Sequence, residues 1–183
     1  GSLVGTTLPL TITQMLWVNL IMDTFAAGAL ASLPPNERVM KDKPRRSGKD
    51  GDFIITRPMA YNIFGVGFAF VVILMGLLFY FHAQDGLTPH DLSWFFSFFV
   101  MLQFWNMFNA KAFMEGRSAF ANLKDSKSFL LVALLILIGQ YLIVTFGGEM
   151  FSVIPLSLKD WAIIIGSSSL VLWIGELFRL FKR

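Results

Sequence analysis

Five stretches of this chain are apolar over about 20 residues, the length with which an α-helix crosses the hydrocarbon core of a membrane. Polar segments with turn-forming residues, such as Pro34, Gly86 and Pro89, separate these stretches. We predict an all-α fold in which residues 1–183 form one polytopic membrane helix bundle of five transmembrane helices. The predicted spans cover residues 9–33, 59–81, 92–113, 129–146 and 161–178.

The composition also indicates an integral membrane protein. With 55% hydrophobic residues, 20 Phe and a mean hydropathy of +0.64, the chain has too little polar surface to cover a soluble globule of its size. The pI of about 9.3 does not indicate a nucleic-acid partner, because the cations lie in short blocks between apolar stretches. The absence of cysteine excludes disulfides and thiolate metal ligands.

The distribution of Lys and Arg predicts the orientation in the membrane. Seven of these cations lie in the loop 34–57, and the tail after Phe178 holds three. The connection after the third stretch contributes Lys111, Arg117, Lys124 and Lys127. Fourteen of the fifteen cations therefore share one side, which the positive-inside rule makes cytoplasmic. We expect an extracytoplasmic N-terminus and a cytoplasmic C-terminus.

The first stretch contains one charged side chain in the middle of an apolar segment. A helix from Pro9 to Leu33 places Asp23 two residues past its centre, at a cost of about 2.5–3.5 kcal/mol. Such acids usually mark ion or proton pathways. Asn19, four residues earlier, lies on the same helical face, and an amide oxygen beside a carboxylate suits a hard cation. The alternative is a structural aspartate that is protonated or paired with a neighbouring helix.

Three amides follow one another along the third stretch. Gln103, Asn106 and Asn109 are spaced so that each lies about 60° around the helix from the one before. We predict that this polar stripe turns inward toward the first stretch. The alternative is that the amides only join helices, each contributing about 0.6 kcal/mol.

Other polar residues within the apolar stretches are predicted to serve packing. Gln140 and Tyr141 stand in an otherwise aliphatic run, and the serines at 167–169 are expected to hydrogen-bond their own backbone. Glu176 and Arg179 have helical spacing and are expected to form a solvated pair near the cytoplasmic end. We expect one break in a span, in the region of Asn19 and Asp23.

The chain contains no phosphate-binding glycine loop and no nucleophile paired with a base, so we expect no catalytic and no cofactor-binding residues within it. Residues 1–10 lack the basic segment of a signal peptide, and there is no initiator Met. We therefore expect the chain to be a segment of a longer protein.

Three motifs resemble one family. Gln-Met-Leu-Trp-Val-Asn-Leu-Ile-Met-Asp-Thr-Phe-Ala, at 14–26, resembles the sixth membrane helix of P-type Ca²⁺-transporting ATPases, and Met22 before the aspartate is similar to the plasma-membrane type. Met-Leu-Gln-Phe-Trp-Asn-Met-Phe-Asn-Ala-Lys, at 101–111, resembles their eighth helix, and 175–180 the end of the tenth. The resemblance covers essentially the whole chain and implies helices six to ten of a ten-helix membrane domain.

This resemblance implies a metal site. It assigns transported Ca²⁺ to Asn19 and Asp23, together with a Glu and backbone carbonyls of a fourth helix outside this chain. Pumps of the sarcoplasmic-reticulum type have a second site, which uses a Thr and a Glu where this chain has Met22 and Gln103. As Ca²⁺ ligands, the thioether of Met22 and the amide of Gln103 do not replace a hydroxyl and a carboxylate. Gln103 therefore marks a lost ion site or a position behind the direct ligands. We expect one Ca²⁺ per cycle, with proton counter-transport.

The resemblance also implies partners. We expect the lipid bilayer of the cell membrane, the N-terminal helices of the same pump and its cytoplasmic domains, which use ATP and Mg²⁺ only in the full-length enzyme. The loop 34–57 is expected to contact the phosphorylation domain, and the chain alone to be inactive. The alternatives are a P-type pump for Na⁺, K⁺ or Mn²⁺, or a non-enzymatic membrane scaffold or channel subunit.

Overall fold

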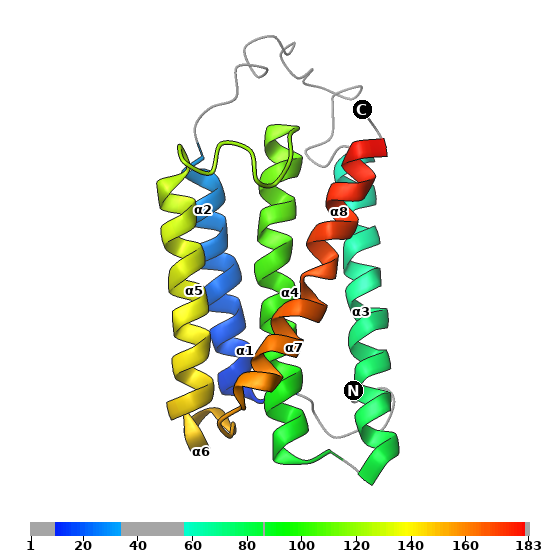
Figure 1. Ribbon diagram of the computed structural model, residues 1–183, viewed down its shortest axis with the longest axis vertical. Helices are drawn as coiled ribbons and strands as arrows, with labels where there is room; N and C mark the ends of the chain where they lie inside the picture. Colours follow the sequence, from blue (N-terminus) through cyan, green and yellow to red (C-terminus); the bar gives the residue numbers. More distant parts are fainter. Residues whose placement is uncertain (1–9, 34–56, 86, 182–183) are drawn as a thin grey trace, which may run out of the picture.

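The structure of the chain is a computed structural model that describes residues 10–33, 57–85 and 87–181. These ranges contain helices joined by turns and loops, without a β-strand, so the predicted all-α bundle is confirmed there (Figure 1). The loop 34–57 lies outside the described residues, apart from Arg57 at the start of a helix. The helices are α1 (Ile12–Asn19), η2 (Leu20–Ala26), α2 (Ala27–Ala31), α3 (Arg57–Asp85), α4 (Pro89–Glu115), α5 (Lys127–Phe146), α6 (Gly148–Phe151), α7 (Leu158–Ser168) and α8 (Leu170–Phe181).

Three of the helices begin at the same local signal, a hydroxyl followed three residues later by a side chain that reaches back. Thr11 with Gln14, Thr88 with Asp91, and Ser157 with Asp160 form capping boxes at the starts of α1, α4 and α7. In each box, two backbone N–H groups that the helix leaves unpaired find acceptors. The sequence therefore sets these three helix starts locally.

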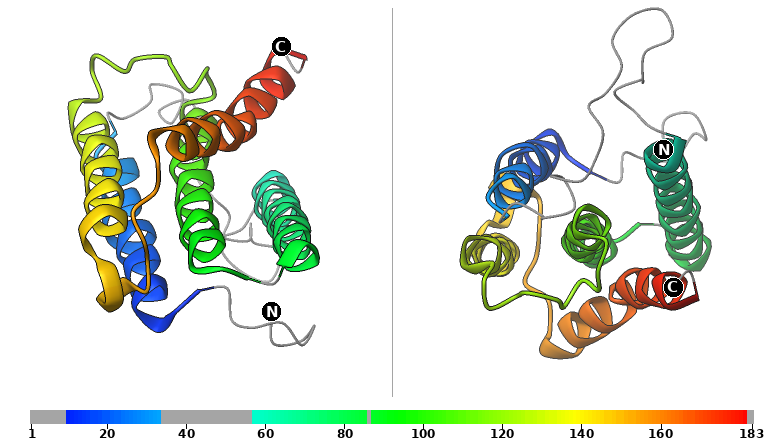
Figure 2. Two further views of the ribbon diagram at one scale, coloured as in Figure 1. Left: turned by 60° about the horizontal axis from the view of Figure 1, so that its bottom comes forward. Right: turned by 90° about the horizontal axis from the view of Figure 1, so that it is seen from above.

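The first three elements follow one another without a gap and form one continuous rod, which we call the first rod (Ile12–Ala31). In Figure 2, right, the first rod, α5, α7, α8 and α3 stand around α4, which occupies the centre. Most of the α4 side chains are buried, including Phe96, Met101 and Ala112. No described helix lies in the sector around α4 between the first rod and α3 (Figure 2).

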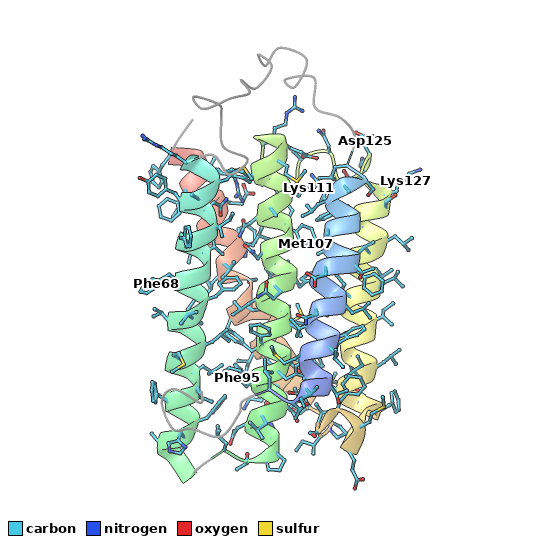
Figure 3. All side chains as sticks on the ribbon, turned by 180° about the vertical axis from the view of Figure 1, so that it is seen from behind. Phe68, Phe95, Met107, Lys111, Asp125 and Lys127 are labelled. Carbon is cyan, nitrogen blue, oxygen red and sulfur yellow. The ribbon has the colours of Figure 1, made fainter. Side chains whose placement is uncertain are left out.

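α3 lies at the edge of the bundle. Only Phe70 and Leu78 among its described apolar side chains are buried, while Phe68 points away from the other helices (Figure 3). Within the described residues, three segments are long and apolar enough to cross a membrane: Met59–Ala83, Lys127–Phe146 and Leu158–Phe181. The first rod and α4 are not among them, and these are the two elements that carry the candidate site residues.

The last predicted span is not one helix. α7 ends at Ser168 and α8 begins at Leu170, so the described chain has six helices of eight residues or more where five were predicted. The Oγ atoms of Ser167 and Ser168 donate to the carbonyls of Ile163 and Ile164, both at 2.6 Å, as predicted for these serines. Such bonds compete with the helical ladder. The serine run therefore marks an interruption that the sequence analysis did not predict.

Lys111 does not lie in a loop, although the prediction of the membrane orientation placed it in the connection after the third stretch. It lies inside α4 with 0% exposure, and its Nζ donates to Glu115 Oε2 at 2.8 Å and to the Ala121 carbonyl at 2.6 Å. Figure 3 shows it near the end of α4, beside the connection to α5. Its charge is neutralised inside the protein and ties this connection to α4.

Candidate metal centre

Asp23 lies in a π-helix within the first rod. Residues Leu20–Ala26 adopt this wider helix, with regular α-helix before and after it. π-helical turns are rare, and they often occur at functional sites. The region of Asn19 and Asp23, where a break was predicted, thus has an irregular helical geometry, but the rod remains continuous there.

The exposed side of the first rod carries the polar groups. Asn19, Asp23 and Thr24 are exposed, whereas Val18 and Ile21 are buried against the bundle. Among the described residues, none forms a hydrogen bond or an ion pair with the side chain of Asn19, Asp23 or Thr24. Thr24 was not predicted as a site residue, although its place next to Asp23 was a visible signal.

Small residues continue this exposed side toward the end of the rod. Ala27, Gly28 and Ala31 are exposed, and a Cβ atom added at Gly28 meets nothing within 4 Å. We call the side formed by Asn19, Asp23, Thr24, Ala27, Gly28 and Ala31 the open face. Small residues allow another helix to approach closely.

The predicted polar stripe of α4 divides into two parts. Gln103 and Asn106 are half-buried and form no hydrogen bond with described residues. Asn109 turns toward α8: its Nδ2 donates to the Val171 carbonyl at 3.0 Å, and its Oδ1 accepts from Arg179 Nη2 at 2.9 Å. Two steps of about 60° separate Asn109 from Gln103 by a third of a turn, which is enough to place it against a different helix. The prediction that all three amides face the first rod is therefore wrong for Asn109.

The described residues do not form a complete metal site. No group of three or more His, Asp or Glu side chains in the described ranges is arranged to hold a metal ion. Asn19 and Asp23 offer an amide and a carboxylate, whereas Ca²⁺ takes six to eight oxygen ligands. No hydrogen bond links Gln103 or Asn106 to Asn19 or Asp23. Asn19 and Asp23 on the open face therefore offer too few oxygen ligands to hold Ca²⁺ by themselves.

Comparison with known proteins decides the family. The family model for the C-terminus of cation-transporting ATPases matches residues 7–181. The chain belongs to this family. It is similar to plasma membrane calcium-transporting ATPase 1 of Mus musculus, at 36% identity over 182 residues that cover 92% of the chain and 14% of the relative.

Other similar relatives carry the same description. Plasma membrane calcium-transporting ATPase 4 of Homo sapiens is 36% identical over 178 residues, covering 90% of the chain and 14% of the relative. Plasma membrane calcium-transporting ATPase 2 of Oreochromis mossambicus is 36% identical over 176 residues, covering 89% and 16%. The resemblance to the plasma-membrane type is confirmed, and the chain spans only about a seventh of the length of these relatives. The apolar helices and these relatives indicate a multi-pass protein of the cell membrane.

In this cation-transporting ATPase segment, the side of the first rod opposite the open face is bonded to α5 and α6. Trp17 Nε1 donates to Gln140 Oε1 at 2.9 Å, and Gln14 Nε2 donates to the Phe151 carbonyl at 2.8 Å. Gln140 was predicted to be a packing residue. Its bond to Trp17 spans 123 residues, a pairing that no local pattern in the sequence reveals.

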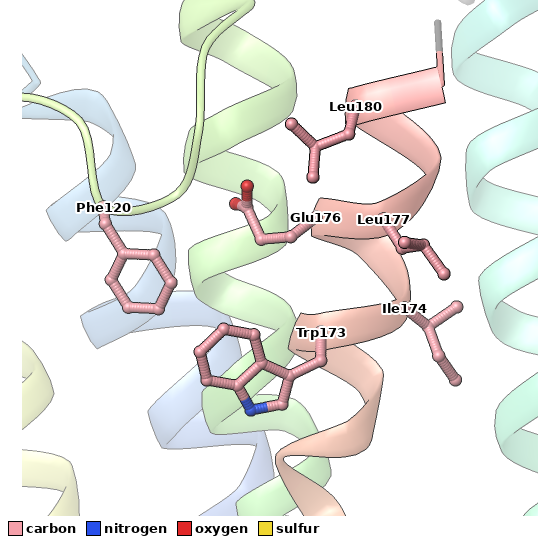
Figure 4. A pocket seen from close by; sticks show the side chains of 6 residues that line it. All are labelled: Phe120, Trp173, Ile174, Glu176, Leu177 and Leu180. Carbon is pink, nitrogen blue, oxygen red and sulfur yellow. The ribbon is translucent and has the colours of Figure 1, made fainter.

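The Glu176–Arg179 pair of the ATPase segment is present, at 2.8 Å, but it is not a solvated pair. Glu176 Oε1 also accepts from the backbone N–H of Ala119 at 2.6 Å, and Arg179 also donates to Asn109. Figure 4 shows Glu176 beside an apolar hollow lined by Phe120 and Trp173. The pair therefore joins α4, α8 and the α4–α5 connection, and the prediction of a solvated pair is wrong.

Proposed function

We propose that the chain is the C-terminal membrane part of an ATP-driven Ca²⁺ pump and that Asn19 and Asp23 supply part of its intramembrane Ca²⁺ site. The observation that carries this proposal is the carboxylate of Asp23 in a π-helix, exposed on the same face as Asn19 and without a hydrogen-bond or ion-pair partner among the described residues. The charge of a carboxylate near the middle of a membrane needs compensation, and a bound cation supplies it. The similarity to plasma membrane calcium-transporting ATPases supports Ca²⁺ as the ion.

In this proposal the segment crosses the membrane five times. The first rod and α4 span it beside the three more apolar segments, with the loop 34–57 and the C-terminus on the cytoplasmic side and the N-terminus outside. The cations of the loop and the tail support this orientation. The described helices shield α4 from lipid on most sides, and preceding helices of the pump cover the remaining sector.

The remaining Ca²⁺ ligands come from helices of the pump that precede this segment. A Glu and backbone carbonyls of one such helix approach the open face and complete the oxygen shell around the ion. Asp23 alternates between Ca²⁺, taken from the cytoplasm, and protons after release of the ion. The small residues of the open face support the approach of another helix.

The proposed stoichiometry is one Ca²⁺ per cycle. A second site near α4 would require an anionic oxygen there, and Gln103 provides only a neutral amide. ATP and Mg²⁺ act in the cytoplasmic domains of the complete pump, and the loop 34–57, outside the described residues, transmits phosphorylation to the membrane segment. The segment alone has no transport activity in this account.

The test is Asp23→Asn in the complete pump. The neutral amide cannot replace a carboxylate in a Ca²⁺ site, so we expect Ca²⁺-dependent phosphorylation by ATP to be abolished. Asp125→Asn is the matched control, because Asp125 is exposed in the α4–α5 connection and should leave phosphorylation unchanged. Phosphorylation of Asp23→Asn at ordinary Ca²⁺ concentrations would contradict the assignment. Dependence on Na⁺, K⁺ or Mn²⁺ instead of Ca²⁺ would identify a different transported ion.

A further inference from the structure

The α1 part of the first rod is fixed to the rest of the bundle at two points. Gln14 bonds to the backbone of α6, and Trp17 bonds to Gln140 of α5. Both glutamines are almost fully buried, with exposures of 1% and 0%. α1 lies at the same end of the bundle as α6, and α5 runs beside the first rod, where it packs against η2 and α2 (Figure 1).

The contact between Trp17 and α5 is tight. A Cβ atom added at Gly139 would lie 2.8 Å from Trp17 Cη2 and 3.0 Å from Cζ2. Atoms this close overlap, so the indole ring rests directly on the glycine backbone. Any larger residue at position 139 would push Trp17, and α1 with it, away from α5.

Packing alone does not account for the amide at Gln140. Its Nε2 atom is buried and has no hydrogen-bond partner in the described part of the chain. A buried N–H without a partner costs free energy that an apolar side chain of similar volume would not. What the amide contributes is the acceptor Oε1, which receives the indole N–H of Trp17.

The other end of the first rod has no comparable anchor. α2, with the sequence Ala-Gly-Ala-Leu-Ala, has no side chain able to form a hydrogen bond, and it meets α5 and α4 through packing only. The π-helix η2 lies between the anchored α1 and the unanchored α2. Asn19, the last residue of α1, lies two residues after Trp17, which forms the nearest side-chain hydrogen bond to the bundle.

We propose that Trp17, Gly139 and Gln140 form a positioning contact that fixes the rotation of the first rod and thereby sets the affinity of Asn19 and Asp23 for the transported cation. This inference rests on the proposed function of these two residues. Trp17 faces α5 and the site residues face the opposite side, so a rotation of the rod at Trp17 moves Asn19 by the same angle. Ligand geometry at a hard-cation site tolerates little displacement.

The first experiment compares two Gly→Ala variants of the complete pump in membranes. Gly139→Ala displaces Trp17, whereas Gly166→Ala, in α7, introduces a methyl group that meets nothing within 4 Å. For Gly139→Ala we expect the half-maximal Ca²⁺ concentration for phosphorylation to rise at least about fivefold, the lower end of couplings between separate sites. The maximal phosphoenzyme per pump at saturating Ca²⁺ should stay unchanged, and Gly166→Ala should match the wild type.

A second experiment tests the same contact if Gly139→Ala misfolds. The double variant Trp17→Phe with Gln140→Leu removes donor and acceptor together and keeps the site filled with apolar groups. We expect the same rise in half-maximal Ca²⁺, again with an unchanged maximum. A purely structural role would lower the maximum and leave the half-maximal concentration where it was, and that result in both experiments would overturn the inference. If phosphorylation of the wild-type pump did not depend on Ca²⁺, this result would overturn the proposed function itself, and the inference with it.

Discussion

At the scale of single residues, the charges of Lys111 and Asp23 have opposite surroundings. Lys111 is paired within the chain, with Glu115 and a backbone carbonyl, whereas Asp23 meets no partner among the described residues. A charge in a low-dielectric setting needs a compensating group. Lys111 thus has a structural role within the segment, while Asp23 is left without a compensating group among the described residues.

This contrast makes a prediction for Lys111. Lys111→Met removes the cation of a buried ion pair and its hydrogen bond to the Ala121 carbonyl, so the free energy of unfolding should fall by about 3 to 5 kcal/mol. Unfolding of the purified protein in a detergent titration measures this change. Lys124→Met, at an exposed position of the same connection, is the control and should have little effect. Equal stability of the two variants would show that the Lys111 pair does not hold the connection.

The sequence singles out Asp23 as a candidate site residue, because a lone carboxylate in an apolar run is visible without any contact information. It did not predict the roles of Trp17, Asn109 or Gln140, whose partners are 62 or more residues away in the chain. It also counted Lys111 as a loop cation, because a charge three residues from the end of an apolar stretch looks solvated until its partners are known.

At the scale of elements, local signals in the sequence account for where helices start. They account for helix interruptions only in part. The residue patterns of the capping boxes at Thr11, Thr88 and Ser157 can be recognised in the sequence. The interruption at Asn19 and Asp23 was predicted, but its π-helical form was not. The interruption between α7 and α8 was missed, because serine side chains that bond to their own backbone are also compatible with an unbroken helix.

The interruption makes a prediction for Ser168, which is fully buried and whose Oγ accepts from Trp105 Nε1 at 3.1 Å. Ser168→Ala leaves this indole N–H without its acceptor, and we expect a loss of about 1 kcal/mol in the free energy of unfolding. Ser167→Ala removes only bonds to the helix's own backbone and should change stability by less than about 0.5 kcal/mol. Detergent-induced unfolding followed by circular dichroism compares the two. A larger loss for Ser167→Ala would refute the role given to the Trp105 contact.

At the scale of the whole molecule, the segment is a bundle around α4 with one sector that no described helix covers. The apolar pattern located every long helix, since apolar length is a property of the sequence alone. The central place of α4 and the edge place of α3 depend on contacts between helices, which the pattern does not encode. The uncovered sector and the open face are the surfaces on which the account places the preceding helices of the pump.

The central claim is that Asn19 and Asp23 form part of a Ca²⁺ site that other helices of the pump complete. Ca²⁺ binding to the complete pump, to its Asp23→Asn variant and to this segment alone tests it most directly. The account predicts tight binding only by the complete wild-type pump, because the segment offers too few oxygen ligands and the variant lacks the carboxylate. Undiminished Ca²⁺ binding by the complete Asp23→Asn pump would contradict it.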